Sequence, residues 1–314
     1  YVWANNHLIM HDAKALLILL KQHDLKVCLL KGAAFIGHYY PDYGMRIMAD
    51  IDLLVSPKQM PELVNIIESN GYKIISGPEE ADTSDFLKLF HAQSFKNSRG
   101  TDFDIHHYVS NFLVNEEFTE RIWQNVKAID LFGIEHLTYV LNPTYQLLHT
   151  VLHGLQYAPE SSIRWIVDAA NLLKNNCDEI NWNEMGDICS KHHLNLPMKM
   201  ALNFLCKELK LPIPQDAISH FNDVKITNRD KDYFVRSSNL GFRNTITRIR
   251  RSWEHYKIYS SGDTKKTSLI GFFDFLLAYL KVNSRWALLP HIAKKFSGVL
   301  WRAFEGMFKR VFSN

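Results

Sequence analysis

The sequence predicts an α+β protein in which a strand-rich first part is followed by a largely helical remainder. Short apolar runs with period-two alternation, separated by glycine and proline turns, recur over residues 1–141 and are typical of strands. Beyond residue 142 the apolar residues recur at helical spacing almost to the end of the chain. The chain of 314 residues is longer than one ordinary domain. We expect a core over residues 1–130, a helical domain over 131–240, and a basic, aromatic-rich helical region over 241–314.

Local signals predict the elements in chain order. The expected elements are an amphipathic helix over 5–23, a strand over 26–30, a short helix over 33–36, a strand over 51–55, a helix over 57–70, a strand over 72–75, a hairpin over 90–95 and 101–108, a helix near 115–125, a strand over 134–141 and a helix over 144–157. Pro57 is a typical first helical residue, and Gly71 is a typical helix stop. The acidic stretch 77–84 is expected to be an exposed loop, and Asn142-Pro143 marks a further helix start.

Two aspartates, Asp50 and Asp52, lie at the start of the otherwise apolar strand expected over 51–55. Because side chains alternate along a strand, Asp50 and Asp52 point to one face and Ile51 and Leu53 to the other. Adjacent carboxylates repel each other and are costly to desolvate unless a cation joins them, so neutralising either one is expected to leave stability unchanged or higher. Carboxylate oxygens suit Mg²⁺, which often also binds substrate phosphate. The pair therefore predicts a phosphate-handling metal site, and the alternative is a pair that ends the strand and caps a turn.

A lysine-glycine turn and an arginine flank this pair in the sequence. The strand over 26–30 ends in Lys31-Gly32, and a helix over 33–36 follows. Glycine lets the backbone approach a phosphate closely, and a helix start offers unpaired N–H groups to an anion. Arg46 precedes the aspartate pair, where its guanidinium could clamp phosphate oxygens. We expect these residues to bind phosphate.

A third acidic position lies in the second strand of the expected hairpin. Alternation places Asp102, Asp104 and His106 on one face, with Phe103 and Ile105 on the other. Such a strand is also compatible with a half-exposed sheet edge. In combination with the first pair and the lysine-glycine turn, a cluster of three carboxylates across neighbouring strands is the better account.

These residues resemble the uncharacterised bacterial nucleotidyltransferase family, within the DNA polymerase β-like nucleotidyltransferase superfamily. The residues that carry the resemblance are Lys31-Gly32, Arg46, Ala49–Val55, Asn70-Gly71-Tyr72, Asp104-Ile105-His106, and then His149, His153, Arg164, Trp165 and Asp168. The resemblance covers about two thirds of the chain, to the region of Pro214. Lys31-Gly32-Ala33 replaces the superfamily's usual glycine-serine, so no serine contact to a triphosphate is carried over. The implied fold is a small mixed sheet flanked by helices, with helical additions after it.

The resemblance implies transfer of an NMP from an NTP, such as ATP, to an acceptor hydroxyl or phosphate, with release of pyrophosphate. The implied catalytic residues and ligands of Mg²⁺ or Mn²⁺ are Asp50, Asp52 and Asp104. The residues expected to bind the phosphates are Lys31, Gly32 and Arg46. The further candidates, next to the metal ligands or on the acceptor side, are Asp102, His106 and Arg164. Asp104 is also the candidate general base, because it should lie nearest the incoming hydroxyl.

Two other functions fit the same residues. One is a toxin-like transferase that adds nucleotides to tRNA and uses the basic C-terminal region as its RNA-binding surface. The other is a non-catalytic nucleotide-binding sensor of the same fold. The presence of all three acids favours an active enzyme. The acceptor stays open between sugar, peptide, antibiotic, protein side chain and RNA.

Two pairs of residues in the helical region have a spacing of four. His149 and His153 share a helix face, a spacing found in zinc sites, but the sequence has no H-E-x-x-H motif and no cysteine placed to help. Structural histidines that bond to a neighbouring helix are the more common case. Arg164 and Asp168 are expected to form an ion pair, and the alternative places Arg164 at the mouth of the substrate cleft.

The C-terminal region is strongly basic. Residues 241–314 contain 14 Lys and Arg against 4 Asp and Glu, whereas residues 1–240 contain 22 against 29. Basic helices with aromatic faces bind anionic membranes or RNA, or they pack on their own protein with solvated cationic edges. The apolar stretch around residues 272–277 is interrupted by charged residues and is too short for a transmembrane helix.

The four cysteines show no C-x-x-C spacing, and no secretory signal opens the chain. They are expected to be reduced interior thiols of a cytoplasmic protein. Peripheral attachment at a membrane is compatible with the basic C-terminal region.

Overall fold

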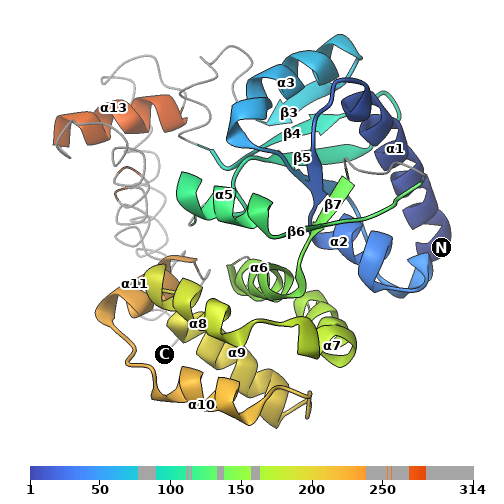
Figure 1. Ribbon diagram of the computed structural model, residues 1–314. Coiled ribbons are helices and arrows are strands. Elements are labelled where there is room, and N and C mark those ends of the chain that lie inside the picture. Colours follow the sequence, from blue (N-terminus) through green and yellow to red (C-terminus); the bar gives the residue numbers. More distant parts are fainter. Residues whose placement is uncertain are drawn as a thin grey trace, which may run out of the picture. The chain divides into compact units, whose positions relative to one another are not determined.

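The computed structural model describes residues 1–76, 90–110, 113, 115–132, 138–156, 163–237, 253, 256 and 269–280. It divides into two compact units, Tyr1–Asn239 and Leu240–Asn314. The first unit contains a sheet and the helices that surround it (Figure 1). The proposed division of this unit near residue 130 stays a prediction.

A mixed seven-stranded sheet is the centre of the first unit, in the order β3-β4-β5-β2-β1-β7-β6. The strands are β1 (Val27–Leu29), β2 (Ile51–Leu54), β3 (Lys73–Ser76), β4 (Ala92–Lys96), β5 (Asp102–His106), β6 (Val126–Ala128) and β7 (Thr138–Leu141). The pairs β1–β7 and β2–β5 are parallel, and the other neighbours are antiparallel. The predicted α+β class with a mixed sheet is confirmed.

The helices of the first unit fall into two groups. Those between or before the strands are α1 (Val2–Gln22), α2 (Lys31–Ala34), α3 (Met60–Ser69) and α5 (Glu116–Gln124). Those after the last strand are α6 (Pro143–Gln156), α7 (Arg164–Asn176), α8 (Trp182–Lys191), α9 (Asn195–Lys207), α10 (Gln215–Asp223) and α11 (Asn228–Ser237). The predicted run of helices after the strands is confirmed. At its start, the Asn142 side-chain oxygen accepts a hydrogen bond from the Tyr145 N–H at 3.1 Å, which caps α6.

The two faces of the sheet belong to different apolar clusters. Ile51 and Leu53 belong to the apolar cluster that includes residues of α1 and α3, whereas Leu54 belongs to the cluster that includes residues of α6 and the helices after it. Because side chains alternate along β2, Asp52 shares the face of Leu54 and points toward α6. The predicted alternation of this strand is therefore confirmed, and it decides which helices can cover the aspartates.

Local details differ slightly from the sequence-based boundaries. Pro57 opens a 3-10 turn, Pro57–Gln59, and the α-helical part starts at Met60. The predicted hairpin is present, and its turn ends at Gly100, whose φ of +90° favours glycine. The predicted exposed loop over 77–84 lies outside the described residues.

The second unit contains α13 (Leu269–Leu280). On it, Phe272 and Phe275 are buried, and their rings contact Tyr256 at centroid distances of 5.7 Å. For these aromatic residues, packing within the unit is thus the observed role. The basic and aromatic residues over 281–314 lie outside the described part.

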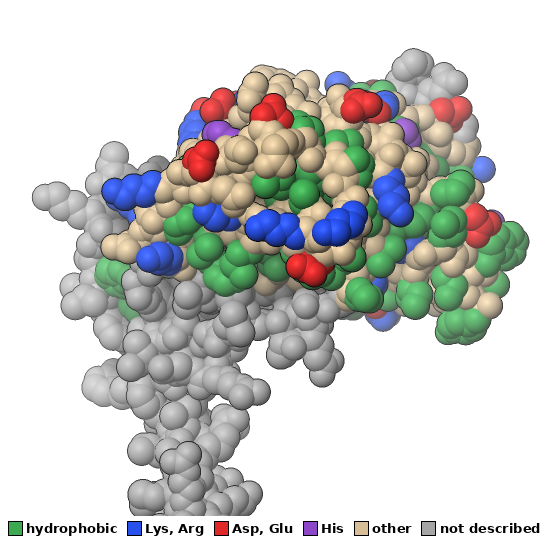
Figure 2. Space-filling view, turned by 90° about the horizontal axis from the view of Figure 1, so that it is seen from below, with side chains coloured by type: hydrophobic (Ala, Val, Ile, Leu, Met, Phe, Trp, Pro, Cys, Tyr) green, Lys and Arg blue, Asp and Glu red, His purple; other side chains and the backbone are tan. Residues whose placement is uncertain are grey.

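Surface cations also occur on the first unit. Figure 2 shows Lys and Arg side chains in a band that runs between hydrophobic side chains. Among the exposed large apolar residues of this unit are Met200 and Phe204 in α9. None of the helices in the described part is both long and apolar enough to cross a membrane. A basic surface is therefore available outside residues 241–314.

All four cysteines are free thiols, as predicted. Cys28 and Cys189 are buried, and Cys177 and Cys206 are half-buried. Burial raises the pKa of the Cys28 and Cys189 thiols, so these side chains are neutral apolar groups of the core.

Candidate active site

The parallel pairing of β2 with β5 brings the two acidic strands together. Asp52 lies directly opposite Asp104, and both side chains point to the same face of the sheet. Ligand atoms of Asp52, Asp104 and His106 all lie within 4.8 Å of one another. Within the described residues, this is the group of acids and histidines that could hold a metal ion.

Asp52 is the buried centre of this group, with 2% of its surface exposed. Its Oδ1 accepts hydrogen bonds from Lys31 Nζ at 2.5 Å and from His106 Nε2 at 3.0 Å. Burial alone would raise the pKa of the Asp52 carboxyl, but the Lys31 ammonium and the His106 hydrogen bond hold this pKa well below its usual range. Asp52 is therefore ionised at neutral pH.

Lys31 is a charged partner of Asp52. Burial lowers the pKa of the Lys31 ammonium, but the charge and hydrogen bond of Asp52, together with the charges of Asp50 and Asp104, raise this pKa above its usual value. The backbone of Lys31 has a φ of +43°, in the left-handed region that a non-glycine residue rarely adopts. Just before it, the Leu30 N–H donates to the Asp52 carbonyl at 3.0 Å. The strained turn between β1 and α2 is thus fixed to β2, and this position brings the ammonium to Asp52.

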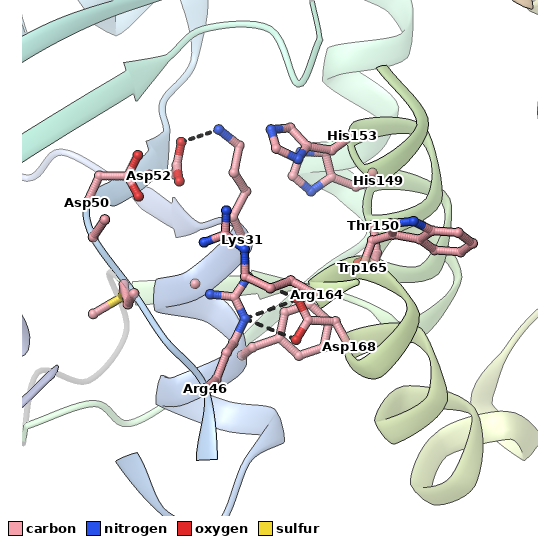
Figure 3. Close-up of a pocket in the computed structure, with 15 residues that line it drawn as sticks. Lys31, Arg46, Asp50, Asp52, His149, Thr150, His153, Arg164, Trp165 and Asp168 are labelled. Atoms are coloured by element: carbon pink, nitrogen blue, oxygen red, sulfur yellow. Dashed lines mark hydrogen bonds and ion pairs between the residues drawn. The ribbon is translucent and has the colours of Figure 1, made fainter. Parts of the chain in front are cut away.

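Asp50 and Asp102 lie beside the group of three rather than in it. Asp50 is half-buried next to Asp52 (Figure 3). Burial and the charge of Asp52 raise the pKa of the Asp50 carboxyl. Asp102 forms an ion pair with Lys96 across the β4–β5 hairpin at 2.8 Å, and its side chain is 42% exposed. Whether Asp50 and Asp102 take part in catalysis stays a prediction.

Arg46 is held by an acid of the helical region. Its Nε donates to both oxygens of Asp168 at 3.0 Å, and its Nη2 donates to Oδ2 at 2.9 Å. The Tyr40 hydroxyl donates to the same carboxylate at 3.2 Å. The expected ion pair of Arg164 with Asp168 is therefore replaced by a pair of Arg46 with Asp168. Arg164 is exposed at the first turn of α7.

Gly32 lies against this arginine. A Cβ atom at Gly32 would come within 2.7 Å of Arg46 Nη1 and 2.9 Å of Met48 Cγ. The absence of a side chain therefore lets the guanidinium lie directly over the α2 backbone. The three residues expected to bind phosphate, Lys31, Gly32 and Arg46, are thus brought together.

A cavity of about 280 Å³ opens beside these residues. Strand β2 and helix α2 form one wall, and α6 and α7 form the other (Figure 3). The polar residues that line it are Lys31, Arg46, Asp50, Asp52, His149, Thr150, His153, Arg164 and Asp168. Asp104 and His106 are not among the lining residues, so they contact Asp52 from the side of β5.

Comparison with known sequences gives a family for this fold and site. The profile of the family described as "Uncharacterised nucleotidyltransferase" matches residues 2–209. The chain belongs to the uncharacterised nucleotidyltransferase family. No curated protein sequence matches this nucleotidyltransferase family member.

One solved structure with a similar description is an antigenic nucleotidyltransferase-like protein from Paracoccidioides brasiliensis. It is 16% identical in sequence, with a TM-score of 0.42, and the match covers 68% of this chain and 96% of that one. A similarity of this size carries no conclusion about the site.

The donor atoms of this nucleotidyltransferase family member fit a divalent metal ion. The carboxylates of Asp52 and Asp104 are oxygen donors of the kind that Mg²⁺ and Mn²⁺ bind. His106 joins them, and its hydrogen bond orients the Asp52 carboxylate. The Lys31 ammonium lies 2.5 Å from Asp52 Oδ1, so an ion held by this group would share the Asp52 carboxylate with the lysine.

Some contacts of the site have no signal in the sequence. Tyr40 and Arg46 both donate hydrogen bonds to Asp168, although 122 residues separate Arg46 from Asp168. No local pattern connects residues so far apart. The spacing of His149 and His153 did predict a common helix face, and the structure places both at the cavity. They are not part of the metal-binding group found among the described residues.

Proposed function

We propose that this protein transfers an NMP from an NTP to an acceptor hydroxyl or phosphate and releases pyrophosphate. The observation that carries the proposal is the parallel register that sets Asp52 beside Asp104, next to a cavity lined by cationic side chains. Family membership makes an NTP the expected nucleotide substrate.

Asp50, Asp52 and Asp104, together with His106, would hold Mg²⁺ or Mn²⁺. When bound, such an ion stabilises the negative charge that develops on the attacking and leaving oxygens. The acceptor oxygen attacks the α-phosphorus, and the bond from this phosphorus to the leaving pyrophosphate oxygen breaks. Asp104 accepts the proton of an acceptor hydroxyl, because it lies on the β5 side of Asp52, away from the cavity.

The cavity residues neutralise and position the phosphates. Lys31 supplies a positive charge next to Gly32, against which the Arg46 guanidinium lies. Arg46 is held in place by Asp168, so its guanidinium is already oriented before a nucleotide binds. Arg164, exposed at the cavity mouth, is a further cation for the triphosphate or the acceptor.

The direct test is incubation of the protein with each NTP labelled at the α-phosphate, Mg²⁺ or Mn²⁺, and a cell extract. Wild type is expected to transfer label to an acceptor, whereas Asp104→Ala is expected to transfer none while still binding NTP in calorimetry. Label on tRNA would support the toxin-like alternative, and NTP binding without any transfer would support a sensor. An Asp104→Ala variant that transfers label at the wild-type rate would contradict the assignment of Asp104.

A further inference from the structure

His149 is a buried polar side chain that faces the cavity from α6. Only 6% of its surface is exposed, and Figure 3 shows its ring facing Lys31 across the cavity. Among the described residues, neither of its ring nitrogens has a hydrogen-bond partner. A buried polar group without a partner costs stability and needs an explanation, and a ligand that binds in the cavity supplies one.

The position of His149 relative to the sheet shows which substrate it faces. The sheet order places β5 on one side of β2 and β1 on the other. Asp104 belongs to β5, whereas the cavity lies on the opposite side of Asp52, next to Lys31 and α2. A substrate in this cavity contacts the phosphate-binding residues, so His149 faces the nucleotide rather than the acceptor.

The chemistry of the cavity favours an anionic group next to His149. Burial, with a smaller contribution from the Lys31 charge, lowers the pKa of His149 to about 3. The ring is therefore neutral at pH 7 and offers one N–H donor and one acceptor nitrogen. Lys31, Arg46 and Arg164 are the cations of the same cavity; Lys31 is paired with Asp52 and Arg46 with Asp168, whereas Arg164 is exposed. An N–H donor near these cations matches a phosphate oxygen.

We propose that His149 donates a hydrogen bond to the polyphosphate of the bound NTP. This inference rests on the proposed function, because it takes the cavity to be the nucleotide site. His153, one turn further along α6, has its ring centroid 6.0 Å from that of His149 and lines the same wall.

The test measures binding of inorganic tripolyphosphate and of ATP, each with Mn²⁺, by calorimetry. His149→Phe keeps a ring of similar size but removes the donor. Since a hydrogen bond to a charged group is involved, binding of both ligands is expected to weaken by about tenfold to hundredfold. His149→Asn keeps an N–H donor and is expected to recover part of the affinity. His192→Phe is the matched control, because His192 is half-buried and lies outside the cavity.

Thermal unfolding without ligand separates this role from a structural one. His149→Phe removes polar atoms that lack partners, so its Tm is expected to equal or exceed that of wild type. If His149→Phe lowers the Tm and leaves the tripolyphosphate affinity unchanged, His149 has a structural role and the inference is overturned. His149→Leu is a second apolar variant for the same measurements.

The binding results distinguish the two levels of the proposal. If His149→Phe weakens ATP but not tripolyphosphate, the contact is to the nucleoside and the inference is wrong. If wild type binds both ligands and His149→Phe binds them equally well, the inference fails while the proposed function stands. If wild type binds neither ligand with Mn²⁺, the proposed nucleotide site itself fails, and the role of His149 fails with it.

Discussion

Replacing Asp52 with asparagine is expected to destabilise the protein, whereas the same change at Asp50 is not. Asp52 is 2% exposed and bonds to Lys31 and His106. Loss of its charge leaves the Lys31 ammonium without its partner at a position where the lysine side chain is only 19% exposed. The sequence alone led to the opposite expectation for Asp52, because repulsion between the two aspartates could be predicted from it, whereas the contact of Lys31 with Asp52 could not.

The size of the effect follows from the burial of the ion pair. Removing one partner of a buried pair costs about 3–5 kcal/mol. The remaining exposure of Lys31 and the nearby Asp50 favour the lower end, about 3 kcal/mol, which corresponds to a Tm decrease of roughly 6–12 °C for a unit of this size. For Asp50, burial and the charge of Asp52 raise the carboxyl pKa. Asp50→Asn removes this unfavourable charge, so stability is expected to be unchanged or higher.

The difference between wild type and Asp52→Asn depends on pH in a defined direction. The folded-state pKa of Asp52 is lowered, so the stability it contributes is fully present above the ordinary aspartate pKa of about 3.9. This contribution is lost as the pH falls toward the folded-state pKa. We therefore expect the full difference at pH 7 and a smaller one below about pH 4.

The assay is urea unfolding of wild type, Asp50→Asn and Asp52→Asn at pH 7, with EDTA present and then with excess Mn²⁺. Wild type is expected to gain stability from Mn²⁺, because an ion that binds only the folded state stabilises it. Asp52→Asn is expected to gain much less. An Asp52→Asn variant as stable as wild type in EDTA would refute the argument from the Lys31 ion pair.

Three further changes test the surroundings of the site. Arg46→Lys cannot reproduce the forked hydrogen bonds to Asp168, so the free energy of unfolding in urea should fall by about 2 kcal/mol. Calorimetry should also show weaker Mn²⁺–ATP binding. If stability and affinity were both unchanged, the Arg46–Asp168 hydrogen bonds would have no part in orienting the guanidinium. Gly32→Ala places a methyl group 2.7 Å from Arg46 Nη1, so ATP affinity should fall while far-ultraviolet circular dichroism stays that of wild type, and equal affinity would show that the guanidinium is free to move. Gly154→Ala places a methyl group in steric conflict with the Trp165 side chain, where α6 packs against α7. The free energy of unfolding in urea is expected to fall by about 1–3 kcal/mol, although alanine has the better helix propensity. A gain in stability would mean that α6 and α7 can move apart at no energetic cost.

The sequence by itself determined which face each strand residue points to. Alternation along β2 and β5 depends only on backbone geometry, so the common face of Asp52 and Leu54, and that of Asp104 and His106, could be read without a structure, whereas Asp50 lies just before β2. Helix boundaries with a strong local signal were determined in the same way, as at Asn142-Pro143. The resemblance to the nucleotidyltransferase family also came from the sequence, through motifs such as Lys31-Gly32 and Asp104-Ile105-His106.

Only the tertiary structure decided which of these side chains meet. The register that sets Asp52 against Asp104 results from pairing between residues 52 positions apart, and no local pattern fixes it. The pairing of Arg46 with Asp168 is likewise not local, since it arises when α7 packs next to the segment that precedes β2. Whether a buried charge is stabilised or repelled depends on the nearest opposite charge in space. For Asp52 that charge is Lys31, and the fold alone brings it within 2.5 Å.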